Sequence, residues 1–225
     1  MDIVINQPAG LGDIFFCQKI AAKLINKGHN VIWPVISNFI WIKDYIDNDI
    51  CFVEKEESEK YKHAEVTVDL QSADKLFPNE SVMISKYKYV NQDYRDWVDF
   101  FNFNRNKEKE RELYYDFLNL KDGEQYAIKN FYFASPPNEQ ICLNAKNSNI
   151  GDLREICMSN IPDFTLIDWC GVIERAAEIH TVETSLNYII EKINTTDKLY
   201  MYSKWSPINF SHIQKLFNKP WIYED

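Results

Sequence analysis

Two short stretches of the sequence combine the residue types that handle anions and protons. Gly10-Leu11-Gly12-Asp13 comes after the apolar run Ile3 to Ile5, and Glu183-Thr184-Ser185 comes after Glu178 to Val182. An amphipathic segment follows each stretch, so the free N–H groups of a helix start lie beside carboxylates or hydroxyls. Such a place favours an anion or a developing negative charge, and an ionised carboxylate there can accept a proton.

The first stretch is positioned by a predicted strand, turn and helix. Ile3 to Ile5 has the length and β-branching of a buried strand, and the two glycines of the turn then interrupt regular structure. From Ile14 to Ile25 apolar residues recur at helical spacing, which puts Lys19 on the solvent side. The pattern predicts one helix beginning at the turn.

A second strand follows this helix. Asn30 to Trp33 is predicted as the strand, ended by Pro34, so that the unit is βαβ with a parallel, right-handed connection. Ligands of such sheets bind outside the carboxyl ends of the strands, where the turn at Asp13 would lie. The alternative is that Asp13 serves as an N-cap or first-turn acid of the helix.

The second stretch has the same arrangement in the other half of the chain. A helical pattern over 166–177 precedes a short strand, Glu178 to Val182, and another helical pattern runs from Leu186 to Ile193. Thr184 and Ser185 then stand where an anion would be received. Simple capping of the helix by either hydroxyl is the alternative.

The segments between these stretches predict further α/β structure. Ala64 to Leu70 alternates as a strand that would bring Asp69 to the rim near Asp13 if it is parallel. The aromatic residues over 94–103 either fill a core or line an acceptor groove. A helix follows with Glu110 outside and Phe117 inside.

The chain is predicted to divide into two small domains. A polar break, Lys121 to Glu124, separates residues 1–122 from residues 123–225, and a fresh strand begins at Tyr126. Asn144 and Lys146 come just after a short strand of the second half and suit contact with phosphate or ribose. The last residues, Lys219 to Tyr223, are expected to be a tail laid across a neighbouring domain.

Composition limits the partners. The formal net charge of -9 over 225 residues argues against non-specific binding to nucleic acid or to anionic membranes. The five cysteines are widely spaced with no Cys-x-x-Cys pair, which indicates a reducing compartment and no structural zinc. With no leader pattern and no long apolar stretch, we expect a cytoplasmic protein without a membrane span. The run Asp47-Asn48-Asp49 is interpreted as a polar turn and not as a metal-binding pair.

The two stretches resemble the GT-B glycosyltransferases, and particularly the heptosyltransferase-like group of glycosyltransferase family 9. Gly10-Leu11-Gly12-Asp13-Ile14 looks like the Gly-Asp turn of that group, and 173–186 looks like its helix, strand and Asp-Thr-Gly/Ser-Leu-His segment. Glu183 stands in place of the usual Asp, and Asn187-Tyr188 stands where a histidine is common. The resemblance implies a compact GT-B fold, with two Rossmann-like domains facing across a cleft.

The resemblance also implies roles. The N-terminal domain would bind the acceptor, a glycan or other glycoconjugate, and the C-terminal domain the nucleotide sugar, which is a substrate and not a cofactor. Asp13 would be the general base of an inverting transfer that needs no divalent metal. The candidate substrate-binding residues are Gly10, Leu11, Gly12, Asn144, Lys146, His180, Glu183, Thr184 and Ser185.

Two other functions compete with this one. A nucleotide or nucleotide-sugar binding module without catalysis would carry the same turns. An NAD-dependent oxidoreductase is disfavoured because Gly10-x-Gly12 lacks the third glycine and no acidic residue follows the second strand.

Overall fold

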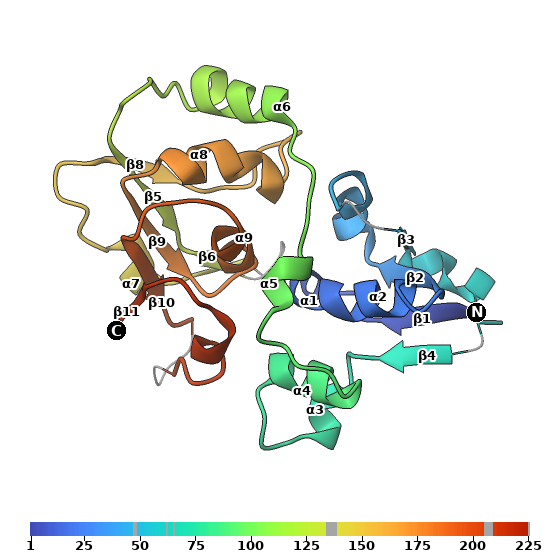
Figure 1. Cartoon of the computed structure of the whole chain (residues 1–225). Coiled ribbons are helices and arrows are strands. Elements are labelled where there is room, and N and C mark those ends of the chain that lie inside the picture. Colours follow the sequence, from blue (N-terminus) through green and yellow to red (C-terminus); the bar gives the residue numbers. More distant parts are fainter. Residues whose placement is uncertain (47–48, 62, 65, 134–138, 205–208, 225) are drawn as a thin grey trace. The chain divides into compact units, whose positions relative to one another are not determined.

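The computed structural model describes residues 1–46, 49–61, 63–64, 66–133, 139–204 and 209–224. It divides into two units, Met1–Asn104 and Arg105–Asp225, each built on one parallel sheet (Figure 1). Asp47 and Asn48 of the acidic run lie outside the described residues. Within the described part of the chain, no helix is long and apolar enough to cross a membrane.

The first unit contains a four-stranded sheet in the order β3-β2-β1-β4. Its elements are β1 (Asp2–Asn6), α1 (Leu11–Phe16), α2 (Gln18–Ile25), β2 (Asn30–Val35), the 3-10 helix η1 (Ser37–Asp44), β3 (Ile50–Glu54), the 3-10 helix η2 (Lys55–Tyr61), β4 (Val66–Asp69), α3 (Ala73–Leu76), α4 (Val82–Tyr89) and α5 (Trp97–Phe100).

The first βαβ unit forms as its pattern predicts, with two local differences. Pro34 lies within β2 and does not end it, because the ladder between β1 and β2 stops at Ile32, so the missing N–H of Pro34 costs no bond to β1. The predicted helix is divided into α1 and α2 at Cys17, where the backbone leaves helical geometry.

The aromatic residues of 94–103 that the structure buries belong to the core. Trp97 and Phe101 are fully buried, and the Phe101 ring stacks on Phe15 of α1 with ring centroids 4.6 Å apart. Phe16 packs against Trp97 at 5.5 Å. These contacts fix the helix that carries Asp13, so for Trp97 and Phe101 the core alternative holds.

The second unit contains a five-stranded parallel sheet in the order β11-β10-β9-β5-β8 and a short antiparallel pair, β6-β7. Its elements are α6 (Lys107–Arg111), the π-helix η3 (Glu112–Phe117), β5 (Tyr126–Asn130), β6 (Tyr132–Phe133), β7 (Gln140–Ile141), α7 (Leu143–Lys146), β8 (Arg154–Cys157), the 3-10 helix η4 (Leu166–Trp169), α8 (Cys170–Arg175), β9 (Glu178–Val182), α9 (Leu186–Lys192), β10 (Leu199–Tyr202), the 3-10 helix η5 (Gln214–Leu216) and β11 (Trp221–Glu224).

The C-terminal residues are an edge strand of this sheet and not a tail across another domain. Strand β11 pairs in parallel with β10 from Leu199↔Trp221 to Tyr202↔Glu224. Glu191 of α9 secures its start, since its carboxylate accepts hydrogen bonds from the Trp221 indole at 2.6 Å and from the Asn218 N–H at 2.9 Å. The expectation of a tail was wrong because these partners are far apart in sequence.

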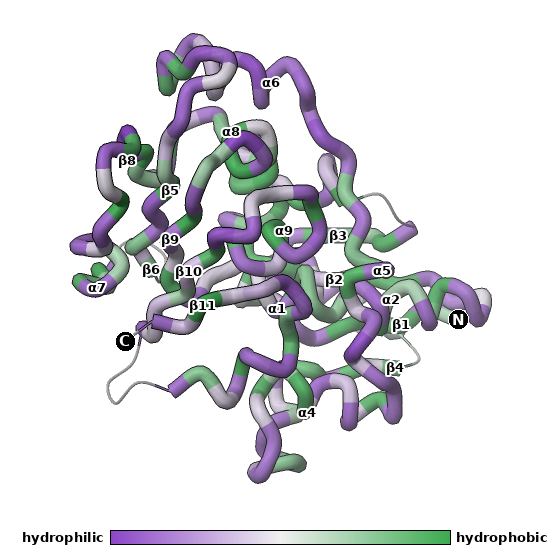
Figure 2. Tube along the Cα trace, turned by 60° about the vertical axis from the view of Figure 1, so that its left-hand side comes forward, coloured by the Kyte–Doolittle hydropathy of each residue, from purple (hydrophilic) through white to green (hydrophobic). Residues whose placement is uncertain are grey.

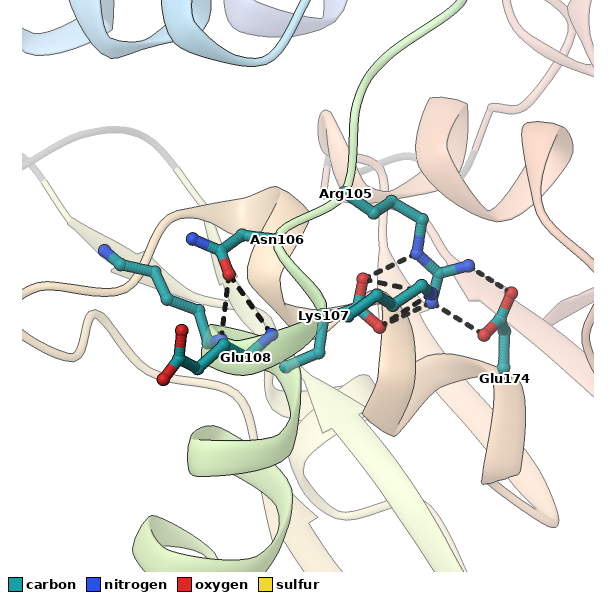
Figure 3. Close-up of polar contacts among 7 residues, drawn as sticks. Arg105, Asn106, Lys107, Glu108 and Glu174 are labelled. Carbon is teal, nitrogen blue, oxygen red and sulfur yellow. Dashed lines mark hydrogen bonds and ion pairs between the residues drawn. The ribbon is translucent and has the colours of Figure 1, made fainter.

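The division between the units lies at Asn104/Arg105, whereas the sequence pattern places it after residue 122. Arg105 explains the difference, because its guanidinium forms two-pronged hydrogen bonds with both Glu110 and Glu174, at 2.5 to 2.7 Å (Figure 3). Glu174 belongs to α8, so the segment that begins at Arg105 is attached to the second unit. These hydrogen bonds raise the pKa of Arg105 against the opposing effect of its burial.

In the helical segment after Arg105, two side chains are buried and exposed in the opposite way to the prediction. Segment α6 consists of charged residues and is drawn in hydrophilic purple in Figure 2, yet Glu110 is buried against Arg105. Phe117 was expected inside but is 57% exposed. Phe117 is the last residue of the π-helix over Glu112–Phe117, and its ring contacts Phe164 with ring centroids 5.9 Å apart.

Candidate functional site

The carboxyl edge of the first sheet brings polar residues together. Strand β4 is parallel to β1 with Asn6 opposite Asp69, as the prediction for Asp69 requires. Asn6 Nδ2 donates a hydrogen bond to Asp69 Oδ1 at 2.8 Å, and the Gln71 N–H donates to the Asn6 carbonyl at 3.0 Å. This edge therefore carries the Asn6 side-chain amide, the Gln71 backbone N–H and the Asp69 carboxylate next to the residues that lead into the turn.

Asp13 and Gly10 are fitted to each other in the turn, which here means residues 10–13. Gly10 has φ +83°, in the left-handed region that glycine adopts without strain. A Cβ at this position would lie 2.3 Å from Asp13 Oδ2, so the carboxylate occupies space that only glycine leaves open. The helix α1 begins at once, since the Ile14 N–H donates to the Gly10 carbonyl at 3.0 Å.

The carboxylate of Asp13 has a buried ammonium behind it. Lys86 Nζ lies 3.1 Å from Asp13 Oδ1, and the two side chains are 2% and 25% exposed respectively. The same ammonium donates to Gln7 Oε1 at 2.5 Å and to the Leu70 carbonyl at 3.1 Å. Asp13 is thus ionically paired on one side and reachable from solvent on the other.

Lys86 and Gln7 were not among the residues singled out by sequence pattern. Lys86 is 73 positions from Asp13 in the printed numbering, on a helix where charged residues ordinarily point to solvent. No spacing rule links residues so far apart. Cys17, the next buried polar group near this pair, is held as a neutral thiol because burial raises its pKa.

In the second unit, hydroxyls gather at the carboxyl ends of β5 and β9. Asn130, the last residue of β5, donates through Nδ2 to both Thr181 Oγ1 and Thr184 Oγ1 at 2.9 Å. Thr181 is fully buried, whereas Thr184 and Ser185 are half-buried. The side chain of Asn130 therefore fixes the hydroxyl of Thr184 at the edge of the sheet.

Glu183 and Asn187 lie inside this second turn, which here means residues 183–185. Glu183 is 6% exposed, and its Oε2 pairs with His212 Nε2 at 3.1 Å. Asn187 is 1% exposed and accepts a hydrogen bond from the Thr184 N–H at 2.7 Å. Glu183 Oε1 and Asn187 Nδ2 have no hydrogen-bond partner among the described residues. His212 was also missed by sequence pattern, since it comes from a distant segment.

Three of the predicted binding residues, His180, Asn144 and Lys146, lie outside the two turns. His180 is 2% exposed, stacks on Tyr200 at 4.4 Å and forms a hydrogen bond with the Tyr202 hydroxyl at 3.0 Å. Burial lowers the pKa of its imidazole. Asn144 and Lys146 are exposed on α7, where the Lys146 ammonium lies 5.8 Å from the centre of the Phe131 ring.

The predicted residues therefore form two groups, one in each unit. Gly10, Leu11, Gly12 and Asp13 share the first turn, and Glu183, Thr184 and Ser185 share the second. The described residues include no group of three or more histidine, cysteine or acidic side chains able to hold a metal ion.

Comparison with known proteins identifies the fold. No protein-family model matches the sequence, and a search of curated proteins gives no match. A glycosyl transferase family 9 protein from Veillonella parvula matches 99% of this chain over 85% of its own length, with a TM-score of 0.57 and 10% identity. The dodecameric iron-containing glycosyltransferase TibC from enterotoxigenic Escherichia coli matches all of this chain over 62% of its own length, with a TM-score of 0.54 and 10% identity.

A third solved structure, the heptosyltransferase WaaC of Escherichia coli with ADP, matches 93% of this chain over 88% of its own length, with a TM-score of 0.44 and 12% identity. The first two matches, together with the two parallel sheets, confirm the predicted α/β class with two Rossmann-like domains of the GT-B type. The resemblance to family 9 is thereby confirmed as a likeness of fold.

Proposed function

We propose that this chain is a glycosyltransferase that moves a sugar from a nucleotide-sugar donor to a hydroxyl of an acceptor. The observation that carries the proposal is the Asp13 carboxylate. It lies in the turn after β1, with 25% of its side chain exposed and its Oδ1 held by Lys86. The likeness in fold to family 9 glycosyltransferases supports the same conclusion.

In this reaction Asp13 is the general base. The acceptor oxygen forms a bond to the anomeric carbon, its proton passes to the Asp13 carboxylate, and the bond from the anomeric carbon to the diphosphate breaks with the electron pair leaving on the diphosphate. Attack from the face opposite the leaving group inverts the anomeric centre. Acid–base catalysis of this kind contributes about 10²–10⁴-fold to a rate.

The donor is assigned to the second unit. Thr184, held by Asn130, and the half-buried Ser185 offer hydroxyls to a diphosphate at the carboxyl edge of the sheet. Hydroxyl groups that donate hydrogen bonds in this way stabilise negative charge on the leaving diphosphate, so the reaction is proposed to run without a divalent metal. The acceptor, a glycan or glycoconjugate, is assigned to the first unit.

A nucleotide-sugar binding module without catalysis is the second candidate. It is favoured by the Asp13–Lys86 pair itself, because a carboxylate that neutralises a buried ammonium has a structural purpose without any chemistry. In such a module the second turn would bind a nucleotide sugar and no transfer would follow.

Turnover by the wild-type chain distinguishes the transferase from the binding module. Purified protein is incubated in EDTA with a panel of UDP-, GDP-, ADP-, CMP- and dTDP-sugars and a glycan acceptor library, and nucleotide release and product are measured. We expect acceptor-dependent release with at least one donor and, by NMR of the product, an inverted anomeric configuration.

Two other results of this experiment would overturn either the proposed catalysis or the proposed metal independence. Calorimetric binding of a nucleotide sugar without transfer or hydrolysis across the panel supports the binding module. Activity that disappears in EDTA and returns with Mg²⁺ removes the claim of metal independence but leaves the transferase.

A further inference from the structure

Lys86 is the most enclosed charged group that touches the first turn. Its side chain is 2% exposed, and its ammonium has three acceptors within hydrogen-bond distance: Asp13 Oδ1, Gln7 Oε1 and the Leu70 carbonyl. The ammonium donates hydrogen bonds to Gln7 Oε1 and the Leu70 carbonyl and forms an ion pair with the Asp13 carboxylate. The acceptors come from the turn and from the residues just after β1 and β4, so one side chain joins three separate segments.

The helix that carries Lys86 is itself fixed to α1. Tyr87, the next residue, is fully buried, and its hydroxyl donates to the Phe16 carbonyl of α1 at 2.6 Å. The rings of Tyr87 and Phe16 pack edge to face at 4.9 Å. Lys86 is therefore held at a constant position relative to the helix on which Asp13 lies.

We infer that Lys86 is a positioning residue for Asp13. The inference rests on the proposed function, in which Asp13 is the base. Lys86 fixes Oδ1, while Oδ2 lies against Gly10. Between them, the ion pair with Lys86 and the close fit to Gly10 leave the carboxylate one orientation at the edge of the sheet.

This role explains a buried lysine that would otherwise be costly. An unpaired ammonium in the interior is strongly disfavoured, and a methionine of similar length would fill the same space without the cost. Lys86 supplies what methionine would not, namely a fixed cation 3.1 Å from a partly exposed carboxylate. Its ammonium contacts Asp13, Gln7 and the Leu70 carbonyl, and it is proposed to act on the reaction through Asp13.

The test compares Lys86→Met with Lys19→Met. Lys19 is a matched control because it is also a buried lysine of the first unit, at 5% exposure, but it pairs with Asp96 and donates to the Asp93 carbonyl at 2.6 Å. With the donor found active for the wild type, kcat is expected to fall about 10²-fold in Lys86→Met, the size of effect that misplacing a catalytic group by about 1 Å produces. In Lys86→Met the KM for the donor stays within about twofold of wild type, and calorimetry gives the same binding stoichiometry. Lys86→Arg, which keeps the cation, retains more activity than Lys86→Met. In Lys19→Met, kcat stays within about threefold of wild type.

If Lys86→Met matches the kcat of Lys19→Met while Asp13→Asn is inactive, the positioning role is overturned and the proposed function stands. A readout without activity covers the case of a chain that has no turnover. The unfolding equilibrium constants of Lys86→Met, Asp13→Asn and the double variant form a cycle, and pairing predicts a departure from multiplicative effects of at least about fivefold. Multiplicative effects would show that Lys86 does not hold Asp13, whatever the reaction.

Discussion

The turn at residues 10–13 and the turn at residues 183–185 both join a parallel strand to a short helix, but different groups hold them. In the first turn, the Asp13 carboxylate is paired with the buried ammonium of Lys86, and Gly10, which has no side chain, leaves room for it. In the second, an amide from the neighbouring strand, Asn130, holds hydroxyls, and the carboxylate of Glu183 is buried.

The difference separates two kinds of chemistry. A partly exposed, oriented carboxylate can take a proton, whereas hydroxyls and amides at a sheet edge can share negative charge on a phosphate without exchanging protons. Glu183, at 6% exposure, is poorly placed to act as a second base. We therefore propose that the first turn accepts the proton and that the second turn binds the donor.

The largest expected effect is that of Asp13→Asn. Asparagine keeps the size of the side chain but cannot take the acceptor proton, so turnover falls by about 10²–10⁴-fold. Asp69→Asn is the control, since it alters another carboxylate at the same sheet edge. Nucleotide release is measured for both variants. Equal losses in the two variants would mean that the edge needs charge in general and not a base at Asp13.

The next effect is that of Gly10→Ala, compared with Gly28→Ala. Both glycines have nearly the same positive φ, +83° and +82°, so the backbone strain of about 1–2 kcal/mol is shared. A Cβ meets Asp13 Oδ2 at position 10 but nothing within 4 Å at position 28. We expect both variants to lose unfolding free energy, Gly10→Ala the more because its Cβ displaces Asp13 from its pairing with Lys86, and a further loss of about 10²-fold in kcat for Gly10→Ala alone. Unchanged kcat in a folded Gly10→Ala protein would contradict the fit between Gly10 and Asp13.

A smaller effect is expected in the second turn. Thr184→Val and Thr181→Val each remove one acceptor of Asn130, but Thr184 is half-buried and Thr181 fully buried. Loss of one hydrogen bond corresponds to about 1 kcal/mol, or roughly fivefold in affinity. Calorimetry is expected to give weaker donor binding for Thr184→Val and unchanged binding for Thr181→Val. The reverse order would move the donor away from this turn.

The smallest effect concerns His180, beneath the second turn. Burial lowers the pKa of its imidazole in the folded protein, so the unfolded chain binds this proton first as pH falls below about 6.5. The contribution to stability is complete above that pH and is lost as pH falls through the lowered value. Thermal unfolding between pH 7 and pH 5 should therefore be less pH-dependent in His180→Phe, which keeps the ring on Tyr200. An identical pH dependence would mean that His180 does not titrate in this range.

Local patterns predicted the strands and turns well. Glu178 to Val182 is a strand with the bounds expected, and both turns lie where an apolar run ends and a helix begins. These features depend on side-chain periodicity and on glycine within a few residues. The same reasoning identified Asp13 and Thr184 as residues at sheet edges.

What the sequence could not show is long-range pairing of charges. Lys19 was assigned to solvent but is buried and paired with the exposed Asp96, and Glu110 was assigned to solvent but is buried and paired with Arg105. A charged residue can be buried when a partner reaches it, and that partner is set by the fold and not by spacing. Lys86 and His212 were missed for the same reason.

Donor affinity of the Asp13→Asn variant tests the division between the two turns most directly. We expect calorimetry with the active donor to give a Kd within about twofold of wild type, because the donor is proposed to bind at the second turn, while turnover is lost. A Kd at least tenfold weaker, with the protein still folded, would contradict it, since Asp13 would then belong to the donor site.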